Sequence, residues 1–378
     1  MFINFWYPMA LTEELTDRPL KVRCIGQDFV VFRSQDGDAN CLSNTCTHRG
    51  GSLGHGKIKG NNIQCPYHGW QYDGEGACQK IPSLGPDAHI PARARVDAYP
   101  VQEKFGIVFA FLGDLSESER PPIIPVPEWD QDGWRPTLVD YDLATNYERS
   151  IENGIDPAHN EFVHDTHGFS GENEDYNVGE MREEHTEWGQ GFWHTFNAPK
   201  LPEGELRKLR DVEGDLEVGT GHHGANQVWT YIHVSPEFHF HQYLFERPID
   251  PENTHIYLLC LRNCMLEAKH DDFMNERNMY VADQDVDVIR NLHPIITPDT
   301  NTKELLLPSD KSVVMYREKV KEWTDEGWRI DVDAVEQNQG KVAYAIPCPG
   351  RRENKGWVLD SIPLVDGGVK DAKLKAAV

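Results

Sequence analysis

The chain has 378 residues, 39% of them hydrophobic and 26% charged, and it is long enough for a large core and two domains. Its formal net charge of −25 argues against general nucleic-acid binding, because a phosphate backbone would be repelled. No apolar run approaches the roughly 20 residues that cross a bilayer, and the N-terminus lacks a basic region before a long apolar core. We therefore expect a soluble, cytoplasmic protein without a membrane span.

The first part of the chain is predicted to be a small all-β domain. Between residues 18 and about 115, short β-like runs such as "DFVVFRS" and "GIVFAFLGD" are separated by turn sequences such as "QDGDAN". A proline-rich stretch, Ser118–Asp130, then interrupts the pattern as a linker would. We place one domain at residues 1–125 and a second at residues 126–378.

The second part is predicted to mix helices with strands. "YDLATNYERSIENGIDPAHNEFVH" has a helical pattern, and residues from about 180 to 265 are again strand-like. Two helices are expected after them, from Glu267 to about Leu292 and from about Ser309 to Glu326. Ser309 is a plausible N-cap for the last helix, and Gly327 supplies its stop.

Eight cysteines in a chain without a secretion signal indicate reduced thiols and metal ligation more than a disulfide framework. Cys260 and Cys264 form a C-x3-C pair, but they lie in the apolar run "YLLCLRNCMLE". Buried cysteine packs as a small hydrophobic residue, so we expect these two to be ordinary core thiols.

A different set of cysteines has the pattern of a metal site. Cys46 and His48 form one Cys-x-His pair, Cys65 and His68 form a Cys-x2-His pair, and sixteen residues separate the two pairs. Two thiolates and two imidazoles suit either zinc or an iron-sulfur centre. Zinc fingers usually bring cysteines as one pair and histidines as another, whereas here each loop offers one of each. A Rieske 2Fe-2S centre, with two cysteines on one iron and two histidines on the other, needs this arrangement.

The flanking sequence favours the same interpretation. Glycines in "CTHRGG" and "CPYHGW" permit positive φ and close backbone approach, so both loops can wrap tightly. The chain resembles the Rieske proteins through C-x-H-x16-C-x2-H, with a zinc ribbon as the alternative. His55 lies between the two pairs and belongs to neither, and we expect it to face solvent.

A second metal-ligand pattern lies in the remaining chain. "ENGIDPAHNEFVH" places Asn153, Asp156, His159 and His164 in the order N-x2-D-x2-H-x4-H. On an ideal helix, at about 100° per residue, the two histidines would stand roughly 140° apart, which is poor geometry for sharing an ion. The helix must therefore widen or break between them, near Pro157. Two histidines with one carboxylate would make the facial triad of non-heme Fe(II) oxygenases.

With both motifs, the chain resembles the Rieske non-heme iron oxygenases, specifically the oxygenase (α) component. Its C-terminal pattern is more similar to the single-subunit branch, which includes demethylating and chlorophyll-derivative monooxygenases. The resemblance implies an α+β fold, with an all-β Rieske domain followed by a catalytic domain of helix-grip, START-like type, in which a helix lies on an antiparallel sheet. It also implies a homotrimer.

The resemblance implies a role for each motif residue. The cluster would be held by Cys46, His48, Cys65 and His68, and the mononuclear iron by His159 and His164. Asp156 would connect a cluster histidine to an iron-bound histidine across the subunit boundary. The family's third iron ligand is an aspartate in the last long helix, where "VADQDVDVIRNL" offers Asp283, Asp285 and Asp287. The pattern D-x2-V-aliphatic selects Asp285, although the glutamine that often closes this segment is absent.

Other histidines receive weaker expectations. We expect His167 near the iron but not bound to it. His222 and His223, in "GTGHHG", are expected in a loop or in the wall of the substrate pocket.

The implied activity is that of a terminal oxygenase. Cofactors would be a Rieske 2Fe-2S cluster and Fe(II), with O2 as co-substrate and NAD(P)H acting through a flavin reductase or ferredoxin partner. Abundant aromatic and apolar residues between about 165 and 265 favour a hydrophobic, cyclic or aromatic organic substrate. We favour hydroxylation or oxidative demethylation, with cis-dihydroxylation as an alternative. A Rieske electron carrier without oxygenase activity is the alternative from another class.

Overall fold

The computed structural model describes residues 1–167, 169–201 and 203–367 and divides into two compact units. Unit 1 contains Met1–Pro122 together with the chain from Glu322 onward, and unit 2 contains Ile123–Lys321. This division differs from the expected domains at residues 1–125 and 126–378, because the C-terminal segment returns to unit 1. Trp323 packs edge-on against Phe5, with ring centroids 4.9 Å apart. Such contacts between distant segments have no local sequence signal.

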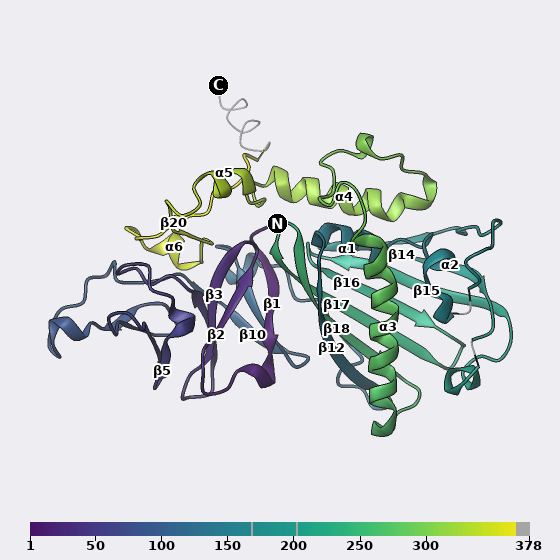
Figure 1. The fold of residues 1–378 in the computed structure, drawn as a ribbon, viewed down its shortest axis with the longest axis horizontal. Helices are drawn as coiled ribbons and strands as arrows, with labels where there is room; N and C mark the ends of the chain where they lie inside the picture. Colours follow the sequence, from purple (N-terminus) through teal and green to yellow (C-terminus); the bar gives the residue numbers. More distant parts are fainter. Residues whose placement is uncertain (168, 202, 368–378) are drawn as a thin grey trace. The chain divides into compact units, whose positions relative to one another are not determined.

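Within the described residues, unit 1 holds three antiparallel sheets and one short parallel pair (Figure 1). The sheet orders are β1-β11-β10, β2-β3-β4-β9 and β5-β6-β7-β8, and the parallel pair is β19-β20. Its strands are β1 (Phe5–Leu11), β2 (Leu20–Cys24), β3 (Gln27–Arg33), β4 (Ala39–Ser43), β5 (Lys57–Lys59), β6 (Asn62–Gln64), β7 (Gln71–Tyr72), β8 (Cys78–Lys80), β9 (Ala98–Tyr99), β10 (Val101–Lys104), β11 (Ile107–Leu112), β19 (Tyr344–Ala345) and β20 (Asp360–Ser361). The predicted all-β character of this part is confirmed.

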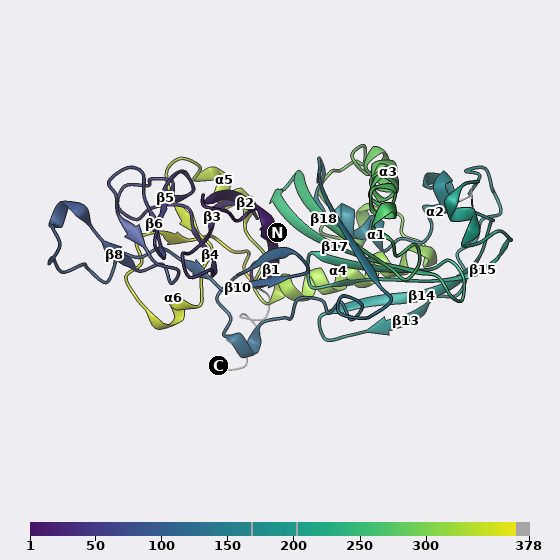
Figure 2. The same cartoon turned by 90° about the horizontal axis from the view of Figure 1, so that it is seen from below.

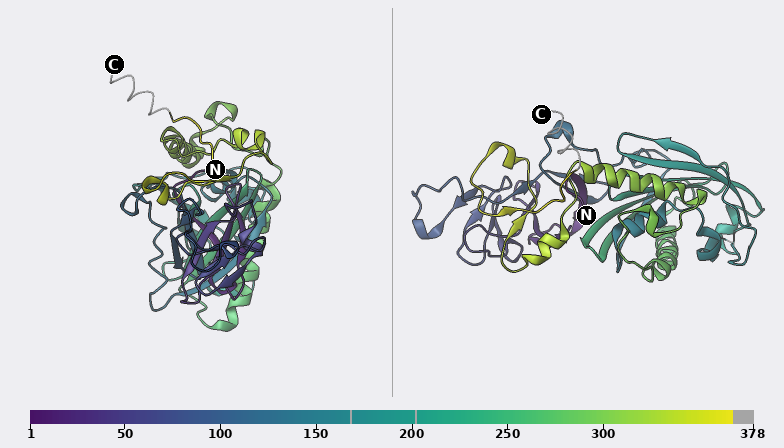
Figure 3. Two further views of the ribbon diagram at one scale, coloured as in Figure 1. Left: turned by 90° about the vertical axis from the view of Figure 1, so that its left-hand side faces the viewer. Right: turned by 90° about the horizontal axis from the view of Figure 1, so that it is seen from above.

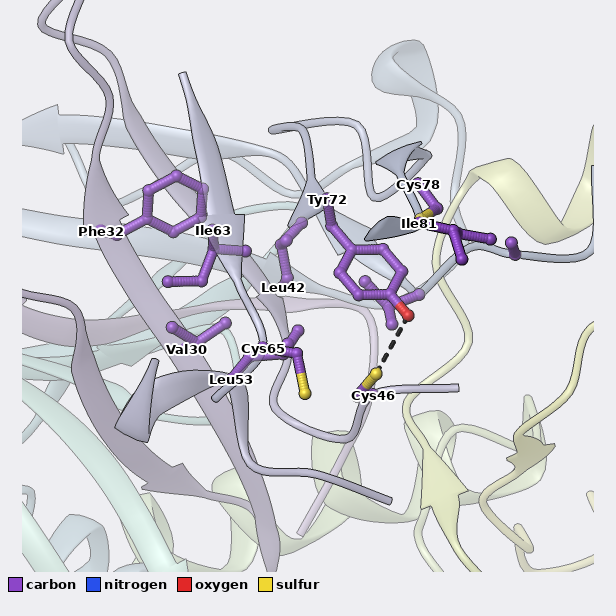
Figure 4. Packing of buried hydrophobic residues seen from close by; sticks show 12 residues of the cluster. Val30, Phe32, Leu42, Cys46, Leu53, Ile63, Cys65, Tyr72, Cys78 and Ile81 are labelled. Carbon is purple, nitrogen blue, oxygen red and sulfur yellow. Dashed lines mark hydrogen bonds between the residues drawn. The ribbon is translucent and has the colours of Figure 1, made fainter. Parts of the chain in front are cut away.

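A buried apolar cluster joins the two four-stranded sheets of unit 1 (Figure 4). It includes Val30 and Leu42 from one sheet and Ile63 and Tyr72 from the other. The close-up shows the sulfur atoms of Cys46 and Cys65 at one border of this cluster. Packing of the two sheets therefore positions the loops that carry the first metal motif.

Unit 2 is built on a seven-stranded antiparallel sheet of order β12-β18-β17-β16-β15-β14-β13. Its strands are β12 (Arg135–Leu143), β13 (Arg182–His185), β14 (Gly189–Ala198), β15 (Gly214–His223), β16 (Gln227–His233), β17 (His239–Asp250) and β18 (Asn253–Arg262). The strand-like pattern predicted from about 180 to 265 is confirmed.

The helices of unit 2 cover a face of this sheet. They are α1 (Tyr147–Gly154), α2 (Asn160–Val163), α3 (Asp271–Ile289) and most of α4 (Lys311–Asp325). Helix α3 runs across the sheet in Figure 1 and is seen nearly end-on in Figure 2, and α1 contacts both α3 and the strands β15, β16 and β17. Helix α4 is one uninterrupted helix (Figure 3). Two short helices, α5 (Val332–Gln337) and α6 (Gly350–Glu353), belong to unit 1. The architecture agrees with the expected α+β class.

Two predicted helix boundaries were wrong. The segment from Tyr141 to His164 is not one helix, because its first residues complete strand β12 opposite β18. Ser309 does not cap α4, because it lies within a short 3-10 turn, Pro308–Asp310, that precedes the helix. None of the described helices is both long enough and apolar enough to span a bilayer.

Candidate metal centres

Two loops of similar construction carry the first metal motif. The loop after β4 holds Cys46, whose carbonyl accepts a hydrogen bond from Gly50 N at 2.9 Å. The loop after β6 holds Cys65, whose carbonyl accepts from Gly69 N at 3.1 Å. Both glycines have positive φ, 71° and 73°, which a side chain would disfavour. Each cysteine thus begins a tight turn that ends at a glycine four residues later.

The loops bring buried sulfur and exposed imidazole to one place. Cys46 and Cys65 are 1% and 2% exposed, whereas His48 and His68 are at the surface with ring centroids 4.3 Å apart. A Cβ on Gly51 would stand 2.8 Å from Cys65 Sγ, so only glycine leaves the cradle open. This arrangement of two inner thiols and two outer imidazoles fits a Rieske 2Fe-2S cluster.

Tyr72 adds a hydrogen bond that sequence reasoning missed. Its hydroxyl lies 3.1 Å from Cys46 Sγ (Figure 4). The same hydroxyl also lies 3.1 Å from Thr47 Oγ1. Burial raises the pKa of the Cys46 thiol to about 11. The Tyr72 hydroxyl and the backbone of His48 oppose that rise. A sulfur in this setting becomes a stable thiolate only with a hydrogen-bond donor and a bound cation. Tyr72, two residues beyond Trp70, supplies the donor.

The second motif is arranged around a break in the helix, as predicted. Helix α1 ends at Gly154, before Pro157, and the four-residue helix α2 lies between the two histidines. His164 leaves the helical conformation, with φ −109° and ψ 83°. The Nε2 atoms of His159 and His164 consequently lie 3.1 Å apart, which a continuous helix would not allow.

Asp285 is the aspartate that faces these histidines. Its Oδ1 atom lies 3.3 Å from His164 Nε2 and 3.6 Å from His159 Nε2. Asp283 and Asp287 are exposed on other sides of α3, so the structure brings only Asp285 of the three beside the histidine pair.

The outer nitrogen of each imidazole faces an oxygen. Asp156 Oδ2 lies 3.7 Å from His159 Nδ1, and Gln284 Oε1 lies 3.2 Å from His164 Nδ1. Gln284 is held in turn by Asp165, whose Oδ1 accepts from Gln284 Nε2 at 2.6 Å. These contacts favour the tautomer with the proton on Nδ1, which leaves the Nε2 lone pairs directed at each other. Sequence reasoning missed Gln284, whose one signal is its place next to Asp285.

The three donor groups fit a mononuclear divalent iron. Metal-ligand bonds of about 2.1 Å at right angles put donor atoms about 3 Å apart, close to the spacings found here. Asp285 Oδ1 is buried and makes no hydrogen bond among the described residues, as expected of a ligand atom. Burial alone would raise the pKa of Asp285, but His164 and His159 hold it below its usual range. The carboxylate is therefore ionised and available.

The three donor groups border an internal cavity of about 190 Å³. Most of its wall is apolar and comes from β15, β16, β17, β18 and α3, with Leu216, Ile232, Phe240, Leu258 and Ile289 among the lining residues. The side chains at alternate positions of β16 and β17 line it, so one face of the sheet forms the floor. The cavity suits a hydrophobic organic molecule beside the metal.

One part of the cavity wall is cationic. Arg210 and Arg277 both line it and belong to the loop before β15 and to α3, respectively. Burial lowers the pKa of both guanidinium groups. Arg210 Nε and Nη1 and Arg277 Nε are buried without hydrogen-bond partners in the described part of the chain. Within the part of the chain that the structure describes, no carboxylate pairs with either guanidinium group, so this part of the wall is suited to an anion.

The remaining predicted residues have varied outcomes. His167 lies next to His164, with ring centroids 5.1 Å apart, and burial together with Arg277 lowers its pKa, so it is a neutral part of the wall. His55 is exposed, as expected. His222 and His223 were misplaced, because they end strand β15 and do not line the cavity in the described structure. Cys260 and Cys264 are 1% and 4% exposed within an apolar cluster, which confirms them as core thiols.

Known proteins share both parts of the chain. Residues 5–100 match the family described as Rieske [2Fe-2S] domain, and residues 143–326 match the family described as vanillate O-demethylase oxygenase C-terminal domain. The chain is 29% identical over 271 residues to Protein TIC 55, chloroplastic, of Pisum sativum, which covers 63% of this chain and 48% of that protein. It is 34% identical over 163 residues to chlorophyllide a oxygenase, chloroplastic, of Arabidopsis thaliana, which covers 43% of this chain and 29% of that protein.

A solved structure has the same fold. NdmA of Pseudomonas putida CBB5 with caffeine aligns at a TM-score of 0.72 and 24% identity, over 85% of this chain and 91% of that chain. The chain spans about half or less of the length of the two curated relatives. Both relatives are named as chloroplastic, so a cytoplasmic location stays a prediction.

The chain belongs to the Rieske non-heme iron oxygenases, because a Rieske domain and an oxygenase domain of that family together match most of its length. Membership implies a Rieske 2Fe-2S cluster and a mononuclear iron.

Proposed function

We propose that this protein is a terminal oxygenase that hydroxylates or oxidatively demethylates a hydrophobic, cyclic or aromatic organic substrate. The observation that carries the proposal is the convergence of His159, His164 and Asp285 at the wall of an apolar cavity. Cys46, His48, Cys65 and His68 would hold the cluster, and the three converging residues would hold the mononuclear iron. When bound, the two centres supply electron relay and activation of O2.

The surrounding residues hold the iron ligands in their binding orientation. Asp156 and Gln284 direct the Nε2 atoms of His159 and His164 toward one point. Asn153, after the two histidines, helps to hold the pKa of the Asp285 carboxyl below its usual range. The apolar wall excludes water, which limits release of oxidant in the absence of substrate.

We further propose that the substrate carries an anionic group, most simply a carboxylate, that Arg210 and Arg277 bind. Both guanidinium groups are buried in the cavity wall with unpaired N–H groups. A carboxylate satisfies such donors in pairs and neutralises their charge. Its position would fix which carbon of the ring or side chain faces the iron.

Asp156 is proposed to connect the two metal centres between neighbouring subunits of a homotrimer. Its Oδ1 accepts from Ala158 N at 2.7 Å, while Oδ2 faces His159 Nδ1. The side chain is 26% exposed, so one of its oxygens remains accessible to an imidazole from another chain. Exposed His48 and His68 are suited to such a contact and to electron entry from a ferredoxin or flavin reductase.

The Asp156 proposal is tested by Asp156→Asn, with exposed Asp175→Asn as the control. We expect Asp156→Asn to retain the Rieske absorption and the full iron content while single-turnover electron transfer to the mononuclear site falls by at least tenfold. Normal turnover in this variant would refute the bridge.

The activity is tested with a surrogate reductase and a panel of aromatic carboxylates, each paired with its uncharged amide. We expect product formation coupled to O2 uptake, detected by mass spectrometry, with the carboxylates preferred. Arg210→Gln should raise the KM for a carboxylate by about 10–100-fold and leave the amide unaffected. Arg207→Gln is the matched control, because Arg207 lies in the same segment but outside the cavity wall. An iron content of about two per chain, with no O2 uptake, would instead support the electron carrier.

A further inference from the structure

A cluster of three histidines lies on the face of the unit 2 sheet opposite the cavity. His233 ends β16, and His239 and His241 lie at the start of β17. Alternate residues of these strands, such as Ile232, point to the cavity, so the histidines point to the other face. One nitrogen of each histidine lies within 4.8 Å of one nitrogen of each of the other two. The cluster is therefore separate from the iron ligands described above.

We propose that His233, His239 and His241 form a second metal site, which binds a borderline divalent cation of the zinc type. Three neutral imidazoles with one open position are a common zinc environment, and imidazole also suits Cu²⁺, Ni²⁺ and Co²⁺. The site goes beyond the proposed oxygenase function and does not depend on it.

His241 is the best-prepared ligand of the three. Its Nδ1 lies 2.6 Å from Glu128 Oε1, and the second oxygen of Glu128 accepts from the Tyr243 hydroxyl at 2.8 Å. A carboxylate in this position holds the proton on Nδ1, as in the carboxylate-histidine-zinc arrangement. His241 Nε2 is buried and has no hydrogen-bond partner among the described residues. Its lone pair is thus otherwise unsatisfied, although the His239 and His241 rings are stacked at an interplanar angle of 4°, so the rings must turn before their nitrogens converge.

His233 also has an oxygen acceptor on one side, because Glu217 Oε2 lies 3.6 Å from its Nδ1. His233 and His239 are cross-strand partners with ring centroids 4.1 Å apart, and both are only half-buried. Their rings can therefore turn about χ2 toward His241 Nε2. Tetrahedral zinc with Zn–N bonds of about 2.0–2.1 Å needs nitrogens about 3.3 Å apart. The three nitrogens now lie within 4.8 Å of one another, so they must approach by at most about 1.5 Å.

The charges around the cluster favour a bound cation. Glu128 and Glu217 supply negative charge around the cluster. A bound cation would tie the loop end of the β16–β17 hairpin together beside Glu128.

The test adds Zn²⁺ alone to protein in which both iron centres are already loaded, and iron is measured beside zinc so that any exchange at the iron site is detected. We expect one zinc per chain to survive gel filtration, measured by mass spectrometry of the elements. His233→Gln and His239→Gln should each weaken Zn²⁺ binding by at least tenfold. Glu128→Gln should weaken it by about 10–100-fold, as loss of an outer carboxylate does. The Rieske absorption of each variant reports that unit 1 is intact, and far-UV circular dichroism reports the sheet.

His255→Gln is the matched control. His255 lies on the same sheet between the carboxylates of Asp140 and Asp142, but outside the cluster. It should keep wild-type zinc binding. The proposal would be overturned if His255→Gln weakened Zn²⁺ binding as much as the cluster variants do. Unchanged Zn²⁺ binding in a His233→Gln/His239→Gln double variant would also overturn it. Cu²⁺ bound to the wild-type chain provides a readout without mutation, because its electron paramagnetic resonance spectrum should show coupling to imidazole nitrogens. A copper spectrum without nitrogen coupling would also overturn it.

Discussion

Tyr72 places its hydroxyl oxygen 3.1 Å from the sulfur of Cys46, although Tyr72 ends strand β7 and Cys46 lies in the loop after β4. A hydrogen bond to sulfur stabilises the more negative, reduced form of an iron-sulfur cluster. We expect Tyr72→Phe to lower the reduction potential of the cluster by about 40 mV, the equivalent of roughly 1 kcal/mol for one electron. Protein-film voltammetry measures this change.

Tyr67→Phe is the control for that measurement, because Tyr67 is 57% exposed and contacts His68 through its ring. Its potential should stay close to that of the wild type. The prediction fails if Tyr72→Phe binds a full cluster whose reduction potential equals that of the wild type. The hydroxyl would then have no electrostatic effect on the cluster.

Loss of the Asp285 carboxylate should remove the mononuclear iron and leave the cluster in place. Asp285 is the one aspartate of its segment that faces His159 and His164 in the structure. We expect Asp285→Asn to reduce the iron content from about three to about two per chain, with the visible Rieske spectrum unchanged. Asp287→Asn, at an exposed position two residues later, should retain all the iron. Loss of iron in Asp287→Asn, with full iron content in Asp285→Asn, would show that Asp287 is the ligand.

Asp271→Asn should strongly destabilise unit 2. Arg135 and Arg262 are direct cross-strand partners, and Asp271 at the start of α3 bridges them with hydrogen bonds of 2.5 to 2.7 Å. The Arg262 side chain is fully buried, so removal of its partner leaves an uncompensated charge. We expect the free energy of unfolding to fall by about 3–5 kcal/mol, measured by urea denaturation. Asp272→Asn, at the neighbouring exposed position, should change it by less than about 0.5 kcal/mol.

Glu246 should make the free energy of unfolding fall as the pH rises from 4.5 to about 8. Burial raises its pKa to about 8, against an ordinary value of 4.5, so the folded state holds a proton that the unfolded chain releases. Its stabilising contribution is complete below about pH 4.5 and is lost as the pH rises to about 8. Glu246→Gln, which stays neutral, should therefore gain stability relative to wild type across this range, on the order of 4 kcal/mol at pH 8 and above.

Thermal and urea denaturation at pH 5, 7 and 9 measure this difference. Exposed Glu252→Gln should follow the wild-type curve at each pH. A difference in the free energy of unfolding between Glu246→Gln and wild type that is the same at every pH would contradict this prediction. It would show that the pKa of Glu246 is the same in the folded and unfolded states.

Candidate ligands could be proposed from the sequence wherever they lie close together along the chain. One loop holds Cys46 and His48, and another holds Cys65 and His68. A short loop that wraps around a cluster needs closely spaced ligands and glycines, and both features can be seen in the sequence. The break between His159 and His164 was also predictable, because helix geometry forbids the required approach. Strand periodicity likewise predicted the β character of both units.

Features that depend on contacts between distant segments were decided by the tertiary structure. No local pattern predicts the return of the C-terminal segment to unit 1 or the contact of Gln284 with His164. The same is true of the buried nitrogens of Arg210 and Arg277 that lack partners among the described residues. The three-histidine cluster arises from hairpin register, which sets His233 opposite His239. Spacing along a chain constrains only near neighbours, whereas burial and charge pairing depend on which surfaces the fold brings together.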